Sequence, residues 1–209
     1  MTDGSRGRLI ALEGIDGGGK STQAALLAAR LGAVLTFEPG ATPLGGQLRG
    51  LLLDSELPPL AERAEALLMV ADRAQHVAEV IAPALEAGRW VVTDRFSGST
   101  LAYQGYGRGL DLADLEPLVD WATGGLAADL SILIEVPPAL AAARFSRDRR
   151  DRFEALGPDF HQRVADGFNR LANDHPKAWA VVDGTGGVDE VAASVWSAVR
   201  ERLGEPTGG

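Results

Sequence analysis

Short apolar runs recur along this chain, and longer stretches whose apolar residues have helical spacing separate them. The runs are rich in β-branched and aromatic side chains and predict strands at residues 9–12, 33–37, 90–93, 130–136 and 178–182. Helices are predicted at residues 20–31, 60–87, 112–121, 138–150, 159–172 and 188–203. Gly32 and Gly88 end the first two helices, and Pro83 is expected to kink or divide the second.

This alternation predicts an α/β fold, a five-stranded parallel sheet with helices on both faces. At 209 residues the chain is long enough for one large core but too short for two ordinary α/β domains, so residues 1–209 are expected to form a single domain. Residues 1–7 and 204–209 are interpreted as flexible tails. Ligands of such sheets bind beyond the carboxyl ends of the strands, so residues directly after each strand are candidates for function.

A glycine-rich motif joins the first predicted strand to the first predicted helix. Residues 14–21 read GIDGGGKS and match the P-loop pattern G-x-x-x-x-G-K-[ST]. Glycines let backbone N–H groups close around phosphate oxygens, and the helix N-terminus adds its positive dipole end. Lys20 is expected to reach the β/γ-phosphates and Ser21 to ligate Mg²⁺, whereas the alternative is an ordinary glycine-rich turn. The predicted nucleotide-binding residues are Gly14, Ile15, Asp16, Gly17, Gly18, Gly19, Lys20, Ser21 and Thr22.

Three further charged residues fall in segments predicted to be buried. Asp94 and Arg95 end the third strand, where Asp94 fits a carboxylate near magnesium and Arg95 fits a phosphate ligand; a surface ion pair is the alternative. Arg73 lies in a largely aliphatic helical segment and therefore needs a partner, either a bound phosphate or base or another part of the protein.

Residues 144–152 hold five arginines in nine positions. Guanidinium groups match phosphate geometry, so residues 144–157 are predicted to form a lid over the triphosphate. A solvated helix face with Arg/Asp pairs and a small RNA-binding patch are the alternatives. The P-loop favours the lid.

Composition limits the partners. Acidic residues outnumber basic residues by 29 to 20, and a formal charge of −9 argues against nucleic acid or an anionic membrane as a partner. The absence of cysteine excludes disulfides and a cysteine nucleophile. No signal-peptide-like start or membrane-spanning run is present, and a cytoplasmic location is expected. The four tryptophans fall in or beside apolar segments and are expected in the core: Trp90, Trp121, Trp179 and Trp196.

Four blocks of sequence together resemble bacterial thymidylate kinases. They are residues 13–21 (EGIDGGGKS), 36–43 (TFEPGATP), 71–76 (ADRAQH) and 94–105 (DRFSGSTLAYQG), in the family's order and spacing. The last block is close to diagnostic, whereas the P-loop alone indicates only the superfamily. The resemblance implies a P-loop nucleoside monophosphate kinase fold with an arginine-rich lid, a homodimer, and phosphorylation of dTMP to dTDP by ATP and Mg²⁺ in dTTP biosynthesis.

The resemblance also implies an acceptor site. Its substrate-binding residues would be Glu38, Pro39, Arg49, Met69, Arg73, Arg95, Thr100, Tyr103 and Gln104. In the family pattern the three arginines gather the monophosphate, and Glu38 and Pro39 line its side. Thr100 and Gln104 would meet the thymine edge, and Tyr103 would crowd the 2′ position and favour deoxyribose.

On the donor side, the resemblance implies that Arg144 flanks the adenine. Gly17 stands where one class of the family has a P-loop arginine, and this matches the class that takes its catalytic arginines from the lid. The implied catalytic residues are Lys20, Arg95, Asp16, Arg147, Arg149 and Arg152, and the implied metal ligands are Ser21, Asp16 and Asp94.

Three positions depart from the family pattern. Phe37 replaces the usual arginine before Glu-Pro-Gly, and Phe96 replaces a tyrosine found in many members. Met69 stands where an aromatic ring stacks on thymine, so it keeps an apolar, polarizable contact without a flat ring. Met69 therefore leaves open a kinase for another nucleoside monophosphate, and a nucleotide-gated ATPase switch is the alternative from another class.

Overall fold

The computed structural model describes residues 6–144 and 151–204. Its strands form one parallel sheet in the order β2-β3-β1-β4-β5, so the strand that enters the P-loop lies in the middle. They are β1 (Leu9–Glu13), β2 (Val34–Phe37), β3 (Val91–Asp94), β4 (Leu130–Glu135) and β5 (Trp179–Asp183). All five predicted strands are confirmed, and the first and last residue of each lie within one residue of the prediction.

The helical elements are α1 (Lys20–Leu31), α2 (Pro43–Leu53), α3 (Glu62–His76), α4 (Ala82–Glu86), α5 (Ser97–Thr100), α6 (Leu112–Thr123), α7 (Pro138–Ala143), α8 (Pro158–Asp174) and α9 (Val188–Leu203), with π-helical turns η1 (Val77–Ile81) and η2 (Leu101–Gly107). The bounds of α1 and α9 agree with the prediction. Gly32 ends α1 in the left-handed conformation, with φ 62° and its N–H on the carbonyls of Ala28 and Ala29.

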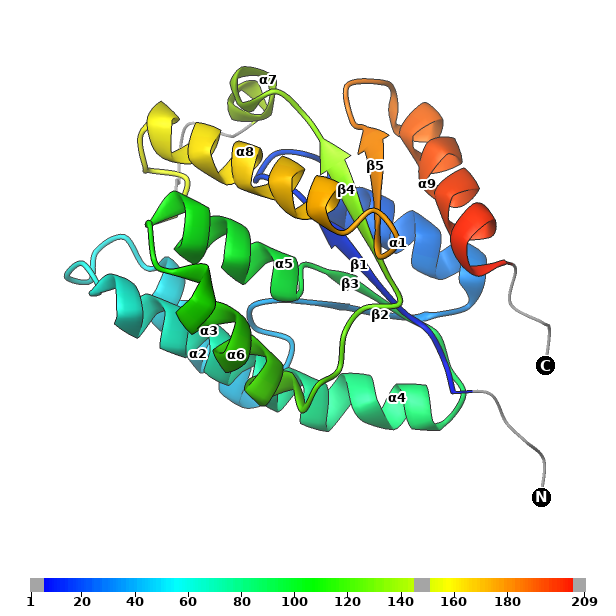
Figure 1. Ribbon diagram of the computed structural model, residues 1–209, viewed down its shortest axis with the longest axis horizontal. Coiled ribbons are helices and arrows are strands. Elements are labelled where there is room, and N and C mark those ends of the chain that lie inside the picture. Colours follow the sequence, from blue (N-terminus) through cyan, green and yellow to red (C-terminus); the bar gives the residue numbers. More distant parts are fainter. Residues whose placement is uncertain (1–5, 145–150, 205–209) are drawn as a thin grey trace.

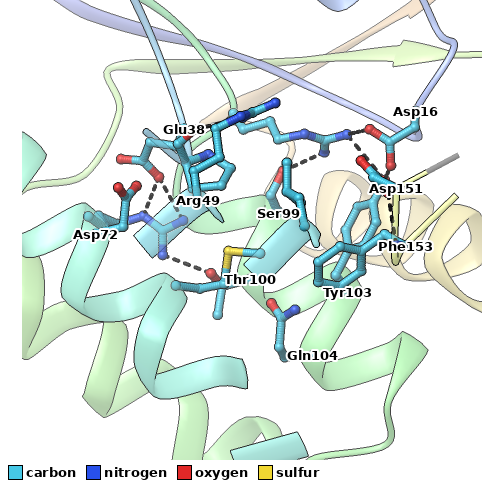
Figure 2. A pocket seen from close by; sticks show the side chains of 15 residues that line it. Asp16, Glu38, Arg49, Asp72, Ser99, Thr100, Tyr103, Gln104, Asp151 and Phe153 are labelled. Atoms are coloured by element: carbon cyan, nitrogen blue, oxygen red, sulfur yellow. Dashed lines mark hydrogen bonds and ion pairs between the residues drawn. The ribbon is translucent and has the colours of Figure 1, made fainter. Parts of the chain in front are cut away.

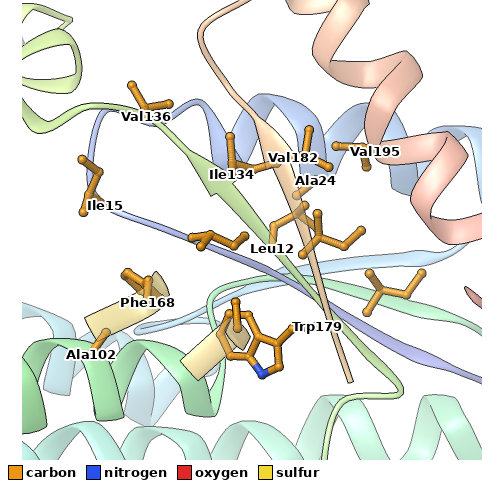
Figure 3. Close-up of a cluster of buried hydrophobic side chains, with 14 of the residues drawn as sticks. Leu12, Ile15, Ala24, Ala102, Ile134, Val136, Phe168, Trp179, Val182 and Val195 are labelled. Carbon is orange, nitrogen blue, oxygen red and sulfur yellow. The ribbon is translucent and has the colours of Figure 1, made fainter. Parts of the chain in front are cut away.

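Helices cover both faces of the sheet (Figure 1). One layer contains α1 and α9, and the other contains α3, α4, α6 and α8. This arrangement buries β1 on both sides: Ile10 and Leu12 pack in a core with Ala24 of α1, whereas Leu9 and Ala11 pack in a second core against η1 and α4. Figure 3 shows the larger core, which continues from Leu12 through β4 and β5 to α9.

The register of the strands brings the carboxyl ends of β1, β2 and β3 to the same height in the sheet. In the β1–β3 and β2–β3 pairs, Leu12 and Phe37 both lie opposite Asp94. The P-loop, Glu38 and Arg95 therefore leave the sheet side by side, although they are far apart in the sequence.

Pro83 divides the long second helix, as predicted. Helix α3 passes into the π-helical turn η1, and α4 follows with Pro83 in its first turn. Proline lacks an N–H, and in an α-helix its ring meets the carbonyl four residues before. The wider π-helical turn at Val77–Ile81 accommodates the proline ring, so the chain stays helical from α3 through to α4.

Two helical segments were not predicted from the sequence. Helix α2 begins after Thr42, whose hydroxyl accepts a hydrogen bond from Gly45 N at 2.9 Å, with Pro43 in its first turn. Residues 97–107 form α5 and η2, although their small polar and glycine residues have low helix propensity.

Two expectations about burial are wrong. Trp121 is 79% exposed on α6, whereas Trp179 is buried as expected. Gly7, which was assigned to the N-terminal tail, is buried, and its N–H donates to Leu85 O at 2.9 Å. Residues 1–5 and 205–209 of the predicted tails lie outside the described residues. Across residues 6–144 and 151–204, no helix is both long and apolar enough to cross a membrane.

Candidate active site

The P-loop connects β1 to α1 at the carboxyl edge. Gly14 has φ 137°, and a Cβ there would lie 2.7 Å from the carbonyl oxygen of Ile134 on β4. Gly19 has φ 89° directly before α1. Other residues rarely adopt such φ values, so both positions require glycine. In the described chain no side chain caps the N-terminus of α1, which is open to an anion.

Lys20 opens α1 with its amino group buried in the loop. Its Nζ donates to Ile15 O at 2.7 Å. Burial lowers the pKa of Lys20 to about 8, and the charge of Arg95 contributes in the same direction while Asp16 opposes it. At this pKa the amine is mostly protonated at neutral pH, so Lys20 serves as a cation.

Ser21 and Asp94 form a pair beside Lys20. The Ser21 hydroxyl donates to Asp94 Oδ2, while Asp94 Oδ1 is buried without a hydrogen-bond partner among the described residues. Nowhere in residues 6–144 and 151–204 do three or more His, Cys, Asp or Glu side chains form a group that could hold a metal ion. Mg²⁺ in nucleotide sites usually takes one or two protein ligands together with phosphate oxygens, and the pair fits this donor set.

Arg95 lies between the P-loop and the short helix α5. It has φ 74°, the only positive φ of a non-glycine residue in the described chain. One guanidinium nitrogen donates to Gly14 O and Ser99 Oγ, both at 3.0 Å, and the other donates to Asp16 and, at 3.2 Å, to the Tyr103 hydroxyl. These contacts hold the guanidinium in one place.

Asp16 is charged because of its neighbours. Burial alone would raise its pKa, but the positive charges of Arg95 and Lys20 and the hydrogen bond from Tyr103 hold that pKa well below its usual range. The Tyr103 hydroxyl donates to Asp16 Oδ2 at 2.5 Å. Asp16, predicted as a metal ligand, is therefore bonded to these side chains and not to the Ser21–Asp94 pair.

Arg73 is buried, and its partners belong to the protein. Its Nε donates to Glu38 at 2.9 Å, and its terminal nitrogens donate to Thr100 Oγ1 at 2.8 Å and Phe96 O at 2.9 Å. Glu38 also contacts His76 Nδ1 at 2.9 Å. These contacts connect α3, α5 and the segment after β2. Of the two partners considered for Arg73, a ligand or another part of the protein, the structure therefore contains the second.

Two depressions meet at these residues. The inner pocket, drawn in Figure 2, is lined by Asp16, Glu38, Pro39, Arg49, Leu53, Met69, Asp72, Arg73, Arg95, Ser99, Thr100, Tyr103, Gln104, Asp151 and Phe153. The P-loop cleft is lined by Asp16, Gly17, Gly19, Lys20, Ser21, Thr22, Ala24, Leu35, Thr36, Phe37, Glu38, Arg49, Asp94, Arg95, Arg144 and Glu154. Asp16, Glu38, Arg49 and Arg95 line both. All nine predicted acceptor-site residues are thus in the inner pocket.

Glu13 was not predicted as a site residue. It is fully buried at the end of β1 and accepts hydrogen bonds from Ser99 Oγ at 2.6 Å and Phe96 N at 3.1 Å. Burial raises its pKa to about 7, although the Ser99 hydrogen bond opposes the shift. A glutamate that ends an otherwise apolar strand was the available sequence signal.

Asp72, Asp151 and Phe153 were also missed. Asp72 Oδ1 accepts from Gly40 N at 3.0 Å, and burial and then the charge of Glu38 raise its pKa to about 6. Phe153 packs edge-on against Tyr103, with ring centroids 5.9 Å apart. An aromatic residue directly after an arginine-rich segment was the signal for Phe153, whereas Asp151 had none.

Comparisons with known proteins agree with this geometry. The thymidylate kinase family profile matches residues 12–195. The chain belongs to the thymidylate kinase family. A thymidylate kinase of Synechococcus sp. (strain JA-2-3B'a(2-13)) is 49% identical over 205 residues, covering 96% of this chain and 98% of the relative. A thymidylate kinase of Chromobacterium violaceum is 47% identical over 196 residues, covering 91% and 92%.

A solved structure extends the agreement to the fold. The crystal structure of thymidylate kinase from Ehrlichia chaffeensis has a TM-score of 0.78 and 31% sequence identity, covering 93% of this chain and 99% of that one. The predicted fold class, an α/β nucleoside monophosphate kinase type, is therefore confirmed.

The three departures from the thymidylate kinase pattern have different surroundings. Phe96 is 1% exposed in the core beside Leu9 and Ala11, where a tyrosine hydroxyl would need a partner. Phe37 is half-exposed, with the Arg49 guanidinium 6.0 Å from its ring centroid. Met69 lines the inner pocket. Only Met69 of the three lies on the inner pocket's wall.

Gly17, where one class of thymidylate kinases has arginine, has φ 76°. A Cβ at this position would lie 2.5 Å from the carbonyl oxygen of Ala141 on α7. The close packing of α7 therefore excludes an arginine side chain from this loop position as the helix stands.

Arg144, implied to flank the adenine, and the three predicted lid arginines are placed differently from one another. Arg144 reaches the P-loop, where its guanidinium donates to Gly17 O at 3.3 Å and Gly184 O at 3.2 Å. Arg152 lies against the loop between α2 and α3 and donates to the carbonyls of residues 54, 57 and 58, so the structure does not bring it to the P-loop. Arg147 and Arg149 lie outside the described residues.

Proposed function

We propose that this chain is the thymidylate kinase of its organism, transferring the γ-phosphoryl group of ATP to dTMP to form dTDP for dTTP synthesis. The observation that carries the proposal is the boundary between the P-loop cleft and the inner pocket. Asp16, Arg49 and Arg95 line both, so two phosphorylated ligands would meet end to end at these charges. Direct transfer requires such an alignment of donor and acceptor.

On the donor side, we assign the phosphates of ATP to the amides of residues 14–19, the Lys20 ammonium group and the N-terminus of α1, with Ser21 and Thr22 at its first turn. Lys20 has the burial and the protonation that this role needs. Arg144 is assigned to the adenine, because it lies between the P-loop and the turn after β5.

We assign Mg²⁺ to Ser21 and Asp94, with Asp16 nearby in the same cleft. The support is the Ser21–Asp94 hydrogen bond and the Asp94 oxygen that has no hydrogen-bond partner in residues 6–144 and 151–204. When bound, the ion would neutralise charge on the phosphate oxygens. The protein's part is to hold the two metal-binding side chains, Ser21 and Asp94, close to the N-terminus of α1.

On the acceptor side, we assign the monophosphate to Arg49 and Arg95, with Glu38 and Pro39 beside it. Arg73 belongs to the same predicted set, but its N–H groups are engaged with Glu38 and neighbouring backbone, which favours a role in shaping the pocket. The nucleoside then extends toward Met69, Thr100 and Gln104. Tyr103, packed among three phenylalanine rings, is assigned to the 2′ side of the sugar.

No general base is required for this chemistry. A nucleoside monophosphate has a second pKa of about 6 and is largely dianionic at pH 7, so its oxygen is already a nucleophile. Catalysis then rests on positioning and on stabilising charge, for which Lys20 and Arg95 are fixed in place. Arg147, Arg149 and Arg152 stay predictions as lid arginines.

A panel of nucleoside monophosphates tests the function directly. With ATP and Mg²⁺, we expect the highest kcat/KM for dTMP among dTMP, dUMP, dCMP, dGMP and their ribose counterparts. Preference for another acceptor would contradict the proposal, and ATP hydrolysis independent of any acceptor would favour a nucleotide-gated switch instead.

We also propose a homodimer and a cytoplasmic location, which rest on family membership. Exposed apolar side chains on three adjacent helices support self-association: Leu44 and Leu51 on α2, Leu67 on α3 and Trp121 on α6.

A further inference from the structure

Gln104 is held at the inner pocket by an ion pair between a buried glutamate and a partly buried arginine. The Gln104 side chain is on η2 and is 1% exposed, and its Nε2 donates to Glu65 Oε1 at 3.0 Å. Glu65, on α3, is equally buried. The same carboxylate accepts two hydrogen bonds from Arg108, from Nε at 3.1 Å and from a terminal nitrogen at 2.7 Å.

This arrangement decides which way the Gln104 amide faces. A glutamine amide has a donor end and an acceptor end of nearly the same shape, so its neighbours must distinguish them. A carboxylate that is paired with arginine can only accept hydrogen bonds. The nitrogen of Gln104 therefore faces Glu65, and the oxygen faces away from it.

Arg108 is in turn held by the aromatic rings of Phe153 and Phe160. Its guanidinium carbon lies 5.1 Å from the ring centroid of Phe160 and 5.8 Å from that of Phe153. These rings keep the arginine over the Glu65 carboxylate. The orientation of Gln104 thus depends on contacts between η2 with its following residue, α3, the segment before α8, and α8 itself.

The free end of the amide is available to a ligand. Among the described residues, Gln104 Oε1 has no hydrogen-bond partner, and Gln104 lines the inner pocket with Met69 and Thr100. In Figure 2 its side chain lies at the end of the pocket opposite Glu38 and Arg49. The pocket therefore presents a carbonyl acceptor at the end farthest from the phosphate-binding arginines.

We propose that Glu65, held by Arg108, is a positioning residue that makes this pocket select pyrimidines carrying an N3–H. Thymine has a hydrogen on N3 and can donate to a fixed amide oxygen. Cytosine has a lone pair on N3, which would face the same oxygen without a hydrogen between them. A Gln104 amide free to turn could accommodate either base. The inference rests on the proposed function, because it concerns the acceptor site of the same kinase.

Glu65→Gln tests the inference. The new amide can both donate and accept, so the Gln104 amide becomes free to turn. We expect the ratio of kcat/KM for dTMP to kcat/KM for dCMP to fall by about tenfold or more, since sites that hydrogen-bond a substrate group owe their discrimination to fixed partners. Glu62→Gln, an exposed change in the first turn of the same helix, should leave the ratio unchanged.

A second comparison separates positioning from structural support. In a Gln104→Leu background the selective oxygen is absent, so adding Glu65→Gln should not lower the ratio further. Should Glu65→Gln fail to fold, Glu65→Asp keeps the charge toward Arg108 but withdraws the acceptor from Gln104, and it should also lower the ratio.

The outcomes are distinguishable. Equal losses of activity on dTMP and dCMP, with the ratio preserved in both Glu65 variants, would overturn the inference and leave the proposed function standing. A wild-type enzyme with no preference for dTMP would overturn the proposed function and the inference together.

Discussion

Arg95 connects the two halves of the site at the level of single atoms. Its guanidinium contacts Gly14 and Asp16 in the P-loop and Ser99 and Tyr103 in the helix beyond. The sequence predicted that Arg95 lies at the end of β3, where its positive charge fits a phosphate ligand. The positive φ could not be predicted, because it depends on how β3 meets α5 in three dimensions.

Arg95→Ala should lower turnover on dTMP by about 10³-fold or more, since arginines that stabilise phosphoryl transfer contribute on this scale. Steady-state kinetics would measure the loss, and circular dichroism and thermal unfolding would confirm that the variant is folded. Arg89→Ala, an exposed change just before β3, should leave turnover unchanged. Near-normal kinetics of Arg95→Ala would remove the residue from its assigned role.

Glu13 should make stability depend on pH. Its pKa is 4.5 ordinarily and about 7 in the folded protein. Folding therefore takes up a proton between these values, and the stability that the neutral carboxyl allows is lost as pH rises through about 7. Relative to Glu13→Gln, which cannot ionise, the wild-type free energy of unfolding should fall by about 3 kcal/mol across this interval, at about 1.4 kcal/mol per pKa unit.

Urea unfolding of both proteins at several pH values between 4 and 8, roughly the interval where the carboxyl changes charge, would test this. Glu201→Gln, an exposed change on α9, should follow the wild-type curve. Parallel curves for wild type and Glu13→Gln would show that the buried carboxyl does not titrate as expected.

At the scale of elements, hydrophobic periodicity predicted the strands and most helices, because their side chains pack on both faces of one sheet. It missed α2, whose Gly45, Gly46 and Gly50 weaken helix propensity although Thr42 and Pro43 are standard start signals. It also missed α5 and η2. There, a Cβ on Gly98 would lie 2.7 Å from the Trp179 ring, and one on Gly107 would lie 2.7 Å from the Phe160 ring. Such glycines are required by tertiary packing, which local sequence does not report.

Gly98→Ala should therefore destabilise the protein by about 1–3 kcal/mol, because the new methyl group meets Trp179 and, at 2.9 Å, Glu13 Oε1. Gly46→Ala on α2 is the matched control. No atom of the described residues lies within 4 Å of its Cβ position, so alanine there should be neutral or stabilising by about 0.4–1 kcal/mol. Denaturant unfolding would measure both, and similar effects of the two changes would argue against packing as the cause.

At the scale of the whole molecule, all the acceptor-site residues implied by the family resemblance line one pocket. Strand register contributes to this, because it brings the segments after β1, β2 and β3 together. The contacts of the buried residues Glu65 and Glu13 could not be predicted, since each joins distant segments, although Glu13 has a sequence signal as the glutamate that ends an apolar strand. Arg152 shows the converse: the arginines around it in the sequence suggested a place over the P-loop, but one terminal nitrogen of its guanidinium donates to carbonyls of another loop.

Trp121 offers a test of assembly. With 79% of its surface exposed on α6, it is the most exposed large hydrophobic side chain in the described chain. If the α2–α3–α6 layer is the dimer interface, Trp121→Asp should shift the sedimentation of the protein from dimer toward monomer. Leu26→Asp on α1, an exposed apolar residue of the opposite helical layer, should not. A Trp121→Asp protein that stays dimeric would place the interface elsewhere.

The boundary formed by Asp16 and Arg95 has a thermodynamic consequence for how the two nucleotides bind. Both residues line the P-loop cleft and the inner pocket, so a ligand in either place alters the field and the contacts that the other ligand meets. Linkage then requires reciprocity: if ATP changes the affinity for dTMP by some factor, dTMP changes the affinity for ATP by the same factor. Neither dissociation constant is a property of one site alone, and each has meaning only together with the concentration of the other nucleotide.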